Sequence, residues 1–163
     1  MISDVDLRHL RRCVELAAQA LAAGDEPFGS VLVAGDGSVL REDHNHVASG
    51  DHTQHPEFAL ARWSAQHLSP EDRAAATVYT SGEHCPMCAA AHGWVGLGRI
   101  VYVASGAQLA AWLTEWGVPA APVAALSVTA IVPDAVVEGP VLELVDDVRA
   151  LHRRLHAPSD RSR

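Results

Sequence analysis

The chain has 163 residues, of which 48% are hydrophobic and 20% are charged, and this balance is typical of one soluble domain with a single continuous core. Its formal net charge of −8, with His neutral, repels polyanions such as nucleic acid or an anionic membrane surface. We therefore expect one domain over 1–157, a disordered tail over 158–163 and a small partner of little charge.

The ends and the apolar segments predict where the protein works. The most apolar stretch, 120–132, contains Pro122 and several small or polar residues, so it falls short of the roughly 20 residues that span a bilayer. The first residues, MISDVDLRHL, lack the basic and apolar segments of a secretory signal. We expect a cytoplasmic protein without a membrane partner.

The first predicted element is an amphipathic helix from Ser3 to Ala23, because apolar residues recur there at spacings of three and four. A capping pair of Ser3 and Asp6 opens this helix, and Gly24 ends it. Cys13 lies inside it and is interpreted as a small, semi-buried hydrophobic residue.

The later elements follow from hydrophobic periodicity and from prolines that begin helices. We expect a hairpin over 28–34 and 38–41, a loop over 42–53, helices over 56–67, 86–95, 109–116 and 141–155, strands over 76–80 and 100–104, and an edge strand around 128–132. This alternation of strands and helices predicts an α/β fold in which helices cover a mixed sheet.

Two short segments carry the candidate chemistry: His55-Pro56-Glu57 and Cys85-Pro86-Met87-Cys88. Each opens a predicted helix, where the dipole and the free N–H groups stabilise thiolates. One imidazole and two thiolates supply three zinc ligands and leave a fourth position for water, as in catalytic sites. Zinc lowers the pKa of that water from ~15.7 to about 7, and Glu57 can stay unligated and carry the proton.

Other interpretations of these segments stay open at this point. A lone CxxC also occurs in redox pairs and in four-ligand structural zinc sites. A redox pair leaves His-Pro-Glu unexplained. A structural site needs one further ligand, for which the candidates are His44, His46, His52, His84 and His92.

The pattern H-x-E followed by P-C-x-x-C is the signature of the zinc-dependent cytidine deaminase superfamily, and the chain resembles this superfamily over about Asp4 to Ala104. His84 stands where the family usually has the proline of P-C, and Pro56 stands where alanine is commoner. Pro27-Phe28-Gly29-Ser30-Val31 resembles the P-F-G-A-V motif of the guanine deaminase and tRNA adenosine deaminase branches.

This resemblance implies a three-layer α/β/α sandwich with a mixed five-stranded sheet and a homodimer. It implies one Zn²⁺ per subunit, held by His55, Cys85 and Cys88. Glu57 would move protons from water to a ring nitrogen and to the departing amine. Asn45 would bind the base and Phe28 would pack near its ring, although Phe28 suits ordinary core packing equally well.

The substrate prediction depends on Trp112, Glu115 and Trp116, which lie roughly where guanine deaminases carry an acidic residue that contacts the purine. Two Trp faces can stack a base, and a carboxylate suits the adjacent N–H donors of guanine. We expect these three residues to bind a guanine-like aminopurine, although they equally suit a helix anchor or a dimer contact. The alternatives are deamination of cytosine, cytidine or another amino-heterocycle such as a triazine, deamination of tRNA adenosine, and a non-catalytic zinc-stabilised binding module.

Overall fold

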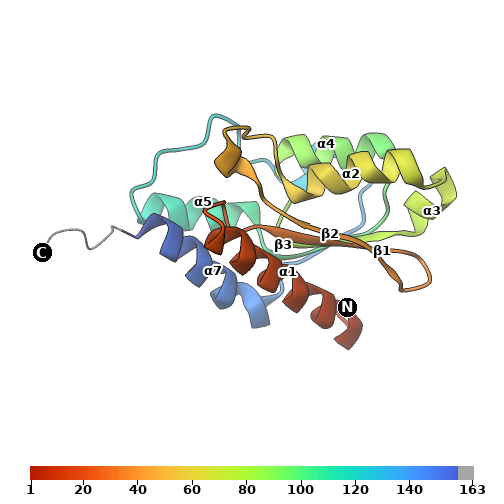
Figure 1. Ribbon diagram of the computed structural model, residues 1–163, viewed down its shortest axis with the longest axis horizontal. Helices are drawn as coiled ribbons and strands as arrows, with labels where there is room; N and C mark the ends of the chain where they lie inside the picture. The colour runs from red at the N-terminus through yellow and green to blue at the C-terminus, as the bar shows by residue number, and fades with distance from the viewer. Residues whose placement is uncertain (158–163) are drawn as a thin grey trace, which may run out of the picture.

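The computed structural model describes residues 1–157, so the tail predicted over 158–163 lies outside the described residues. The strands are β1 (Gly29–Val33), β2 (Val39–His44), β3 (Thr77–Gly82), β4 (Ile100–Ala104) and β5 (Val137–Glu138). The helices are α1 (Asp4–Ala22), α2 (Pro56–His67), α3 (Pro70–Ala75), α4 (Pro86–Val95), α5 (Gly106–Glu115), α6 (Val128–Ile131) and α7 (Leu142–His156), with a 3₁₀ turn η1 (Val47–Ser49). Figure 1 shows α2, α3 and α4 on one side of the sheet and α1, α5 and α7 on the other, which confirms the three-layer prediction.

The sheet is mixed, with the strand order β2-β1-β3-β4-β5. β1 pairs antiparallel with both β2 and β3, whereas β3, β4 and β5 run parallel to one another. The carboxyl ends of β2, β3 and β4 therefore meet the start of β1 at the same edge of the sheet. Ligands of open α/β sheets bind at such an edge.

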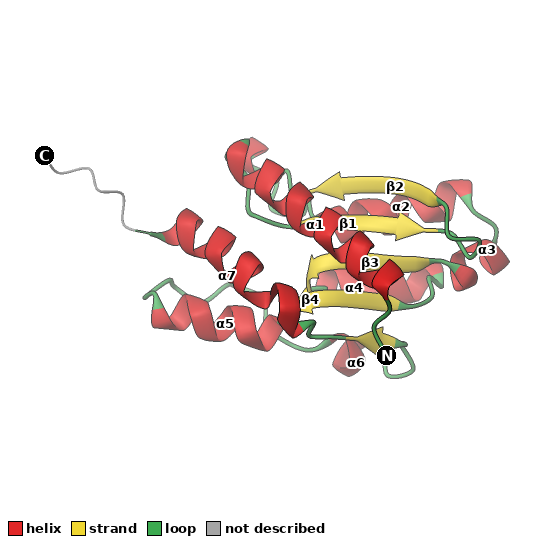
Figure 2. Cartoon of the chain, turned by 90° about the horizontal axis from the view of Figure 1, so that it is seen from below, coloured by secondary structure: helices red, strands yellow, loops and turns green. Residues whose placement is uncertain are grey.

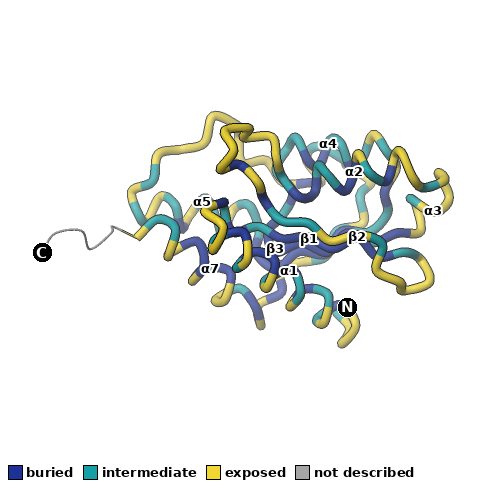
Figure 3. Tube along the Cα trace, viewed as in Figure 1, coloured by how far each residue is buried: buried dark blue, intermediate teal, exposed yellow. Residues whose placement is uncertain are grey.

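The strands separate two apolar layers. In β1, Val31 and Val33 contribute to the core under α1 and α7, whereas Leu32 contributes to the core under α2. Such alternation follows from the two-residue period of a strand. All residues of β1 and β4 are buried, and Figure 3 shows the central strands as the dark, buried part of the chain. Strands covered on both faces are expected as continuous apolar runs.

The helix α1 confirms its predicted caps and is fixed to the sheet by a polar cluster. The Ser3 hydroxyl accepts a hydrogen bond from the Asp6 N–H, and the Ser3 N–H donates to the Asp6 carboxylate. Asp6 also accepts hydrogen bonds of 2.7 Å from Tyr79 and from Arg99. Arg99 in turn pairs with Glu138 of β5, so one buried carboxylate connects α1, β3 and the parallel part of the sheet. Figure 2 shows α1 and α7 lying across this face.

A close approach between α1 and β1 requires glycine at position 29. A Cβ atom there would lie 2.4 Å from the Cys13 carbonyl oxygen and 2.5 Å from the Leu16 Cβ. Cys13 itself is fully buried, which fits its interpretation as a small hydrophobic residue. Gly29 thus sets how closely α1 covers the site-bearing end of the sheet.

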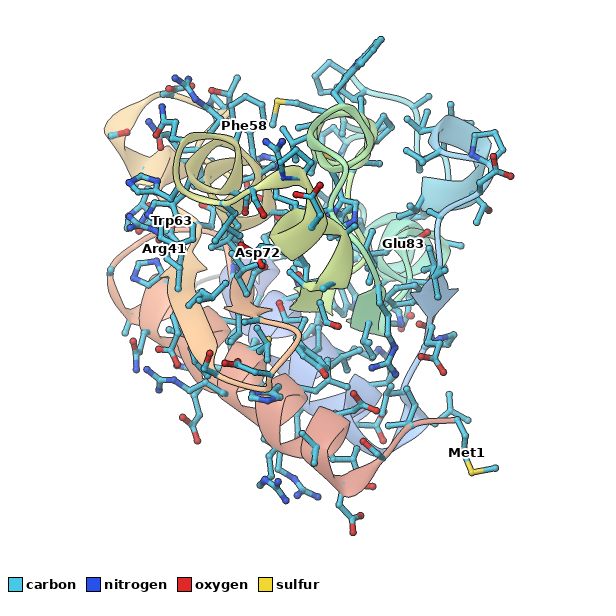
Figure 4. All side chains as sticks on the ribbon, turned by 90° about the vertical axis from the view of Figure 1, so that its right-hand side faces the viewer. Met1, Arg41, Phe58, Trp63, Asp72 and Glu83 are labelled. Atoms are coloured by element: carbon cyan, nitrogen blue, oxygen red, sulfur yellow. The ribbon has the colours of Figure 1, made fainter. Side chains whose placement is uncertain are left out.

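The edge strand β2 differs from the central strands because charged side chains cover it. It carries Arg41, Glu42 and Asp43, of which Arg41 and Glu42 are exposed. The guanidinium of Arg41 lies 5.8 Å from the ring centroid of Trp63 on α2, as Figure 4 illustrates. Glu42 accepts hydrogen bonds from Arg12 of α1.

Two expectations about the connections were wrong. The segment 128–132 is not an edge strand but begins with the short helix α6, because the Ser127 side chain accepts from the Ala130 N–H and Glu83 accepts from the Val128 N–H. The edge strand is instead β5. Residues 42–53 are not all loop, since β2 continues to His44 and η1 follows.

Two other boundaries also differ from the prediction. An additional helix, α3, follows the helix predicted over 56–67, and Ser69 caps it through a hydrogen bond from the Asp72 N–H to the Ser69 hydroxyl. α5 begins at Gly106 rather than Leu109, because Ser105 and Gln108 form a capping box. None of the described helices has the length and apolarity required to cross a bilayer.

Candidate functional site

The predicted metal ligands lie at the N-terminal ends of two neighbouring helices, α2 and α4. His55 is the N-cap residue of α2 and Cys85 is that of α4, and each is followed by a proline. Proline suits the first helical position because its fixed φ is helical and its missing N–H has no partner to lose there. Figure 4 shows the two helices side by side, which brings the imidazole near both thiols.

The side chains of His55, Cys85 and Cys88, called here the zinc triad, form a nearly equilateral triangle. His55 Nδ1 lies 3.5 Å from Cys85 Sγ and 3.6 Å from Cys88 Sγ, and the two sulfurs are 3.6 Å apart. A tetrahedral zinc ion with Zn–S of ~2.3 Å and Zn–N of ~2.0–2.1 Å would separate its donors by about 3.5–3.8 Å. The triad therefore fits zinc without rearrangement.

The triad contains no fourth protein donor. Among residues 1–157, no further His, Cys, Asp or Glu joins these three within 4.8 Å. The histidines considered as a fourth ligand therefore lie outside the group, which argues against a four-ligand structural site. Both cysteines are free thiols, so the pair is not a disulfide.

Hydrogen bonding within the triad prepares a thiolate. The hydrogen bonds from Cys88 and His55 lower the pKa of the Cys85 thiol to about 4, whereas the hydrogen bond with Cys85 and burial raise the pKa of Cys88. The hydrogen bond with Cys85 also raises the pKa of His55. Cys85 is therefore ionised at neutral pH, and the thiolate is the form that binds zinc.

Glu57 lies in the first turn of α2, buried behind the triad residue His55. Burial raises the pKa of its carboxyl group. One oxygen, Oε1, accepts a hydrogen bond of 2.6 Å from the Thr80 hydroxyl, and Thr80 accepts one of 2.9 Å from Ser30. Glu57 does not join the donor group of the triad, so its carboxylate remains available for proton transfer.

Ser30 and Thr80 were missed by the sequence analysis. Both side chains are fully buried, and they face each other in the register of β1 and β3. The available signal was weak, because β3 also carries the hydroxyl residues Thr77 and Ser81. Their pairing could not be predicted because it depends on the antiparallel register.

Asn45 follows β2 and keeps an unused donor. Its N–H donates to the Phe28 carbonyl oxygen at 3.0 Å, and its side-chain Oδ1 accepts from the Val47 N–H at 3.0 Å. The side chain is 1% exposed, and Nδ2 has no hydrogen-bond partner among the described residues. An unsatisfied buried donor costs about 1–3 kcal/mol, so this amide is suited to a ligand.

Phe28 lies at the same edge of the sheet, just before β1. It is half-buried, and its ring meets the His152 ring of α7 edge to face at 4.9 Å between centroids. A Cβ atom on Gly82 would lie 3.1 Å from the Phe28 ring, so this glycine leaves room for the ring at the end of β3. Phe28 thus has packing partners and also retains exposed surface.

Trp112 and Glu115 lie on α5, and Trp116 is its C-cap residue, on the opposite face of the sheet from α2 and α4. Trp112 belongs to the core under α1 and α7. Glu115 pairs with Arg149 of α7 at 3.0 Å, and Arg153 lies 5.3 Å from the Trp116 ring centroid. Glu115 and Trp116 line a cleft of about 660 Å³ between α5 and α7 whose lining contains no triad residue. Substrate binding by these three residues stays a prediction.

The segment between β3 and the triad has its own structural contacts. Glu83, labelled in Figure 4, accepts hydrogen bonds from the N–H groups of Gly106 and Val128 and so joins the starts of α5 and α6. His84 is buried against His92, with ring centroids 5.2 Å apart. Burial lowers the pKa of His84 well below its usual range, so its imidazole is neutral.

Comparisons with known proteins agree with this geometry. The model of the cytidine and deoxycytidylate deaminase zinc-binding region matches residues 3–104, which include the triad, Glu57, Asn45 and Phe28. A Schizosaccharomyces pombe protein named "Probable cytosine deaminase" is 33% identical over 108 residues, covering 66% of this chain and 65% of that protein. The Bacillus subtilis guanine deaminase is 37% identical over 97 residues, covering 58% of this chain and 62% of that protein.

The chain therefore spans slightly less than two thirds of the length of these two relatives. A solved structure of guanine deaminase from Nitrosomonas europaea matches 97% of this chain and 87% of its own, with a TM-score of 0.69 and 21% identity. At that identity the likeness shows the fold alone, and it extends over the helices beyond residue 104.

Proposed function

Because the chain belongs to the family that carries the cytidine and deoxycytidylate deaminase zinc-binding region, we propose that it is a hydrolase that deaminates an amino-substituted nucleobase. In this reaction a C–O bond forms at the amino-bearing ring carbon, the C–N bond breaks, and ammonia leaves behind a carbonyl group. The observation that carries the proposal is a triad of three donors 3.5–3.6 Å apart beside a buried, unligated carboxylate.

Zinc held by the triad supplies Lewis acidity, which lowers the pKa of water from ~15.7 to about 7. Glu57 then acts as the proton carrier of the reaction. Its carboxylate takes a proton from water, passes it to a ring nitrogen, and delivers the second proton to the departing amine. The hydrogen bond from Thr80 occupies Oε1, which leaves Oε2 for these transfers.

Asn45 is proposed to orient the base. Its unpartnered Nδ2 can donate to a ring carbonyl or ring nitrogen, while its Oδ1 keeps the loop in place through the Val47 N–H. A buried donor left without its partner discriminates against analogues that lack the acceptor. Phe28, at the same edge of the sheet, is proposed to contact the face of the ring.

We favour a guanine-like aminopurine as the substrate, with cytosine as the second candidate. The similarity to the Bacillus subtilis guanine deaminase supports the first, and that to the Schizosaccharomyces pombe protein supports the second. Both bases have an amino group on a carbon next to a ring nitrogen and a ring carbonyl that Asn45 can bind. The net charge of −8 argues against folded tRNA. A homodimer and a cytoplasmic location stay predictions.

The test is ammonia release from guanine, adenine, cytosine, their nucleosides and amino-triazines by zinc-loaded protein. We expect turnover of guanine, and we expect Glu57→Ala to lower kcat by at least about 100-fold, because general acid–base catalysis contributes 10²–10⁴-fold. Zinc content measured on both proteins is the control. Full activity of Glu57→Ala with zinc bound would contradict the role of Glu57, and absence of turnover across the panel would contradict the function.

A further inference from the structure

A second group of potential metal ligands lies in the described part of the chain and shares no residue with the zinc triad. One ligand atom of each of Asp25, His44 and His46 lies within 4.8 Å of the others; these residues are called here the loop cluster. Asp25 comes from the connection between α1 and β1, whereas the histidines flank Asn45 at the end of β2. We propose that the loop cluster binds a second divalent transition-metal ion.

The hydrogen bonds of the two histidines leave one ring nitrogen of each free. His44 Nδ1 lies 2.8 Å from the Asn45 carbonyl oxygen, which can only accept, so Nδ1 carries the proton and Nε2 keeps a lone pair. His46 Nε2 lies 3.0 Å from Asp43 Oδ1, and the same argument leaves its Nδ1 free. Metal-binding histidines almost always donate their other N–H to a carbonyl or carboxylate in this way.

Asp25 supplies the third donor and is already held in place. Its Oδ1 accepts a hydrogen bond of 2.9 Å from the Ala48 N–H, and Oδ2 has no hydrogen bond among the described residues. The carboxylate is only 6% exposed. A buried carboxylate with a free oxygen beside two imidazoles is costly unless it is paired or bound to a metal.

The donor types select the class of metal. Two imidazoles and one carboxylate suit zinc and other first-row divalent ions, whereas calcium and magnesium prefer oxygen ligands alone. Tetrahedral bonds of ~2.0–2.1 Å place donors about 3.3–3.4 Å apart. Metal binding therefore requires the three donor atoms to move closer together. The half-exposed side chain of His46 is free to make this movement.

The position of the loop cluster means that a bound ion would affect the loop around Asn45. His44 and His46 flank Asn45, and Asp25 holds the N–H of Ala48 in η1. An ion bound by all three would cross-link the end of β2 to the connection before β1. It would thereby restrict the loop that presents the unpartnered Nδ2 of Asn45.

Metal stoichiometry tests the proposal without any measurement of turnover. Protein stripped by a chelator is reloaded with Zn²⁺ and its metal content is measured after buffer exchange. We expect two ions per chain in the unaltered protein and one in His46→Ala and in Asp25→Asn, which keeps an oxygen for the Ala48 N–H. His52→Ala, an exposed histidine of the same loop outside the cluster, is the matched control and should retain two.

Cobalt titration assigns each ion to its site. Co²⁺ in the triad gives an intense thiolate-to-metal absorption band in the near ultraviolet, whereas Co²⁺ in the loop cluster gives only weaker visible bands. We expect a double variant, Cys85→Ser with Cys88→Ser, to lose the first signal and keep the second. Asp43→Asn should lower the affinity for the second ion by about 10- to 100-fold.

One ion in the unaltered protein, or two ions in His46→Ala and Asp25→Asn, would overturn the proposal. Either result would leave the proposed deaminase function intact, since that function depends on the triad and Glu57. Conversely, a protein that is inactive on every amino-heterocycle would contradict the deaminase function but not the second ion, because metal content is measured without turnover. Hydrogen exchange adds an independent readout, because the amides of Val47 and Ala48 should exchange more slowly once the second ion is bound.

Discussion

At Glu57, burial and a hydrogen bond act in opposite directions on the same carboxyl group. Burial raises its pKa, whereas the Thr80 hydroxyl lowers it by donating to the charged form. Ser30 orients Thr80 from the neighbouring strand. Thr80 is therefore a positioning residue, which acts on the reaction through Glu57.

We predict that Thr80→Val lowers kcat by about 10- to 100-fold, because a hydrogen bond to a charged group contributes about 1.5–3 kcal/mol. KM and zinc content should stay near their original values. Steady-state kinetics with the preferred base measure the split between kcat and KM. Thr129→Val, at an exposed threonine of α6, is the matched control. An unchanged kcat in folded Thr80→Val would contradict the positioning role of Thr80.

The residues of the site differ in how visible they are in the sequence. The triad and Glu57 could be predicted because each motif is contiguous and opens a helix. Ser30 and Thr80 are 50 positions apart and meet only through strand register. The unpartnered Nδ2 of Asn45 is likewise a property of its buried surroundings. The placement of Glu115 in an ion pair with Arg149 depends on how α5 and α7 pack.

At the scale of elements, the packing of α1 on β1 depends on the absence of a side chain at position 29. A Cβ atom there would meet backbone of α1 rather than a flexible side chain. Neither the helix nor the strand can yield without losing its own hydrogen bonds. The contact is therefore rigid, and it supports the strand that carries Ser30.

We predict that Gly29→Ala lowers the free energy of unfolding by about 1–3 kcal/mol or more, as overpacked cores do. Urea denaturation of the zinc-loaded protein measures the change. Gly106→Ala is the control, because its Cβ would lie 3.6 Å from Glu83 Oε2, an ordinary contact. Equal stability of the two variants would contradict the rigid contact between α1 and β1.

Elements with a clear start signal or a continuous apolar run could be predicted, but the short helices α3 and α6 could not. α2, α4 and β4 have the bounds that the sequence predicts, since a proline begins each helix and β4 is a continuous apolar run. The run at 128–132 fits a strand or a helix equally well by its composition. Two hydrogen bonds decide for the helix: the Ser127 hydroxyl accepts from the Ala130 N–H, and the distant Glu83 carboxylate accepts from the Val128 N–H.

At the scale of the whole molecule, buried titratable groups make stability depend on pH. Burial and the nearby His156 lower the pKa of His152 to about 4. Burial alone would raise the pKa of Asp6, but hydrogen bonds from Arg99, Ser3 and Tyr79 outweigh it and lower that pKa. Because the pKa values of His152 and Asp6 are lower in the folded protein, the unfolded chain binds protons more readily at these two groups. Acid therefore favours unfolding.

We predict that the contribution of His152 is present above pH 6.5 and is lost as the pH falls from 6.5 to about 4. The loss amounts to about 3 kcal/mol at most, since one pKa unit corresponds to 1.36 kcal/mol. His152→Gln, which cannot titrate, should flatten the stability curve in this window. Unfolding free energies of both proteins between pH 7 and 4 measure the difference, and parallel curves would refute the assignment.

The fold class could be predicted from the sequence, but the contacts that join distant parts of the fold could not. Alternating strands and helices indicated a layered α/β fold, and the resemblance implied five strands. The polar link from Asp6 through Arg99 to Glu138 joins residues more than 130 positions apart along the chain. Such a link depends on the finished topology, and no local pattern indicates it.

The charged margin of β2 bears on how copies of the protein can meet. An open sheet edge is a template on which a strand from another molecule can add, and that addition is the first step toward fibres. Arg41, Glu42 and Asp43 place both signs of charge along this edge, and Arg12 and Trp63 already hold two of these side chains. Self-assembly should accordingly proceed through helical surfaces, and concentrated solutions should resist fibrillisation by β2.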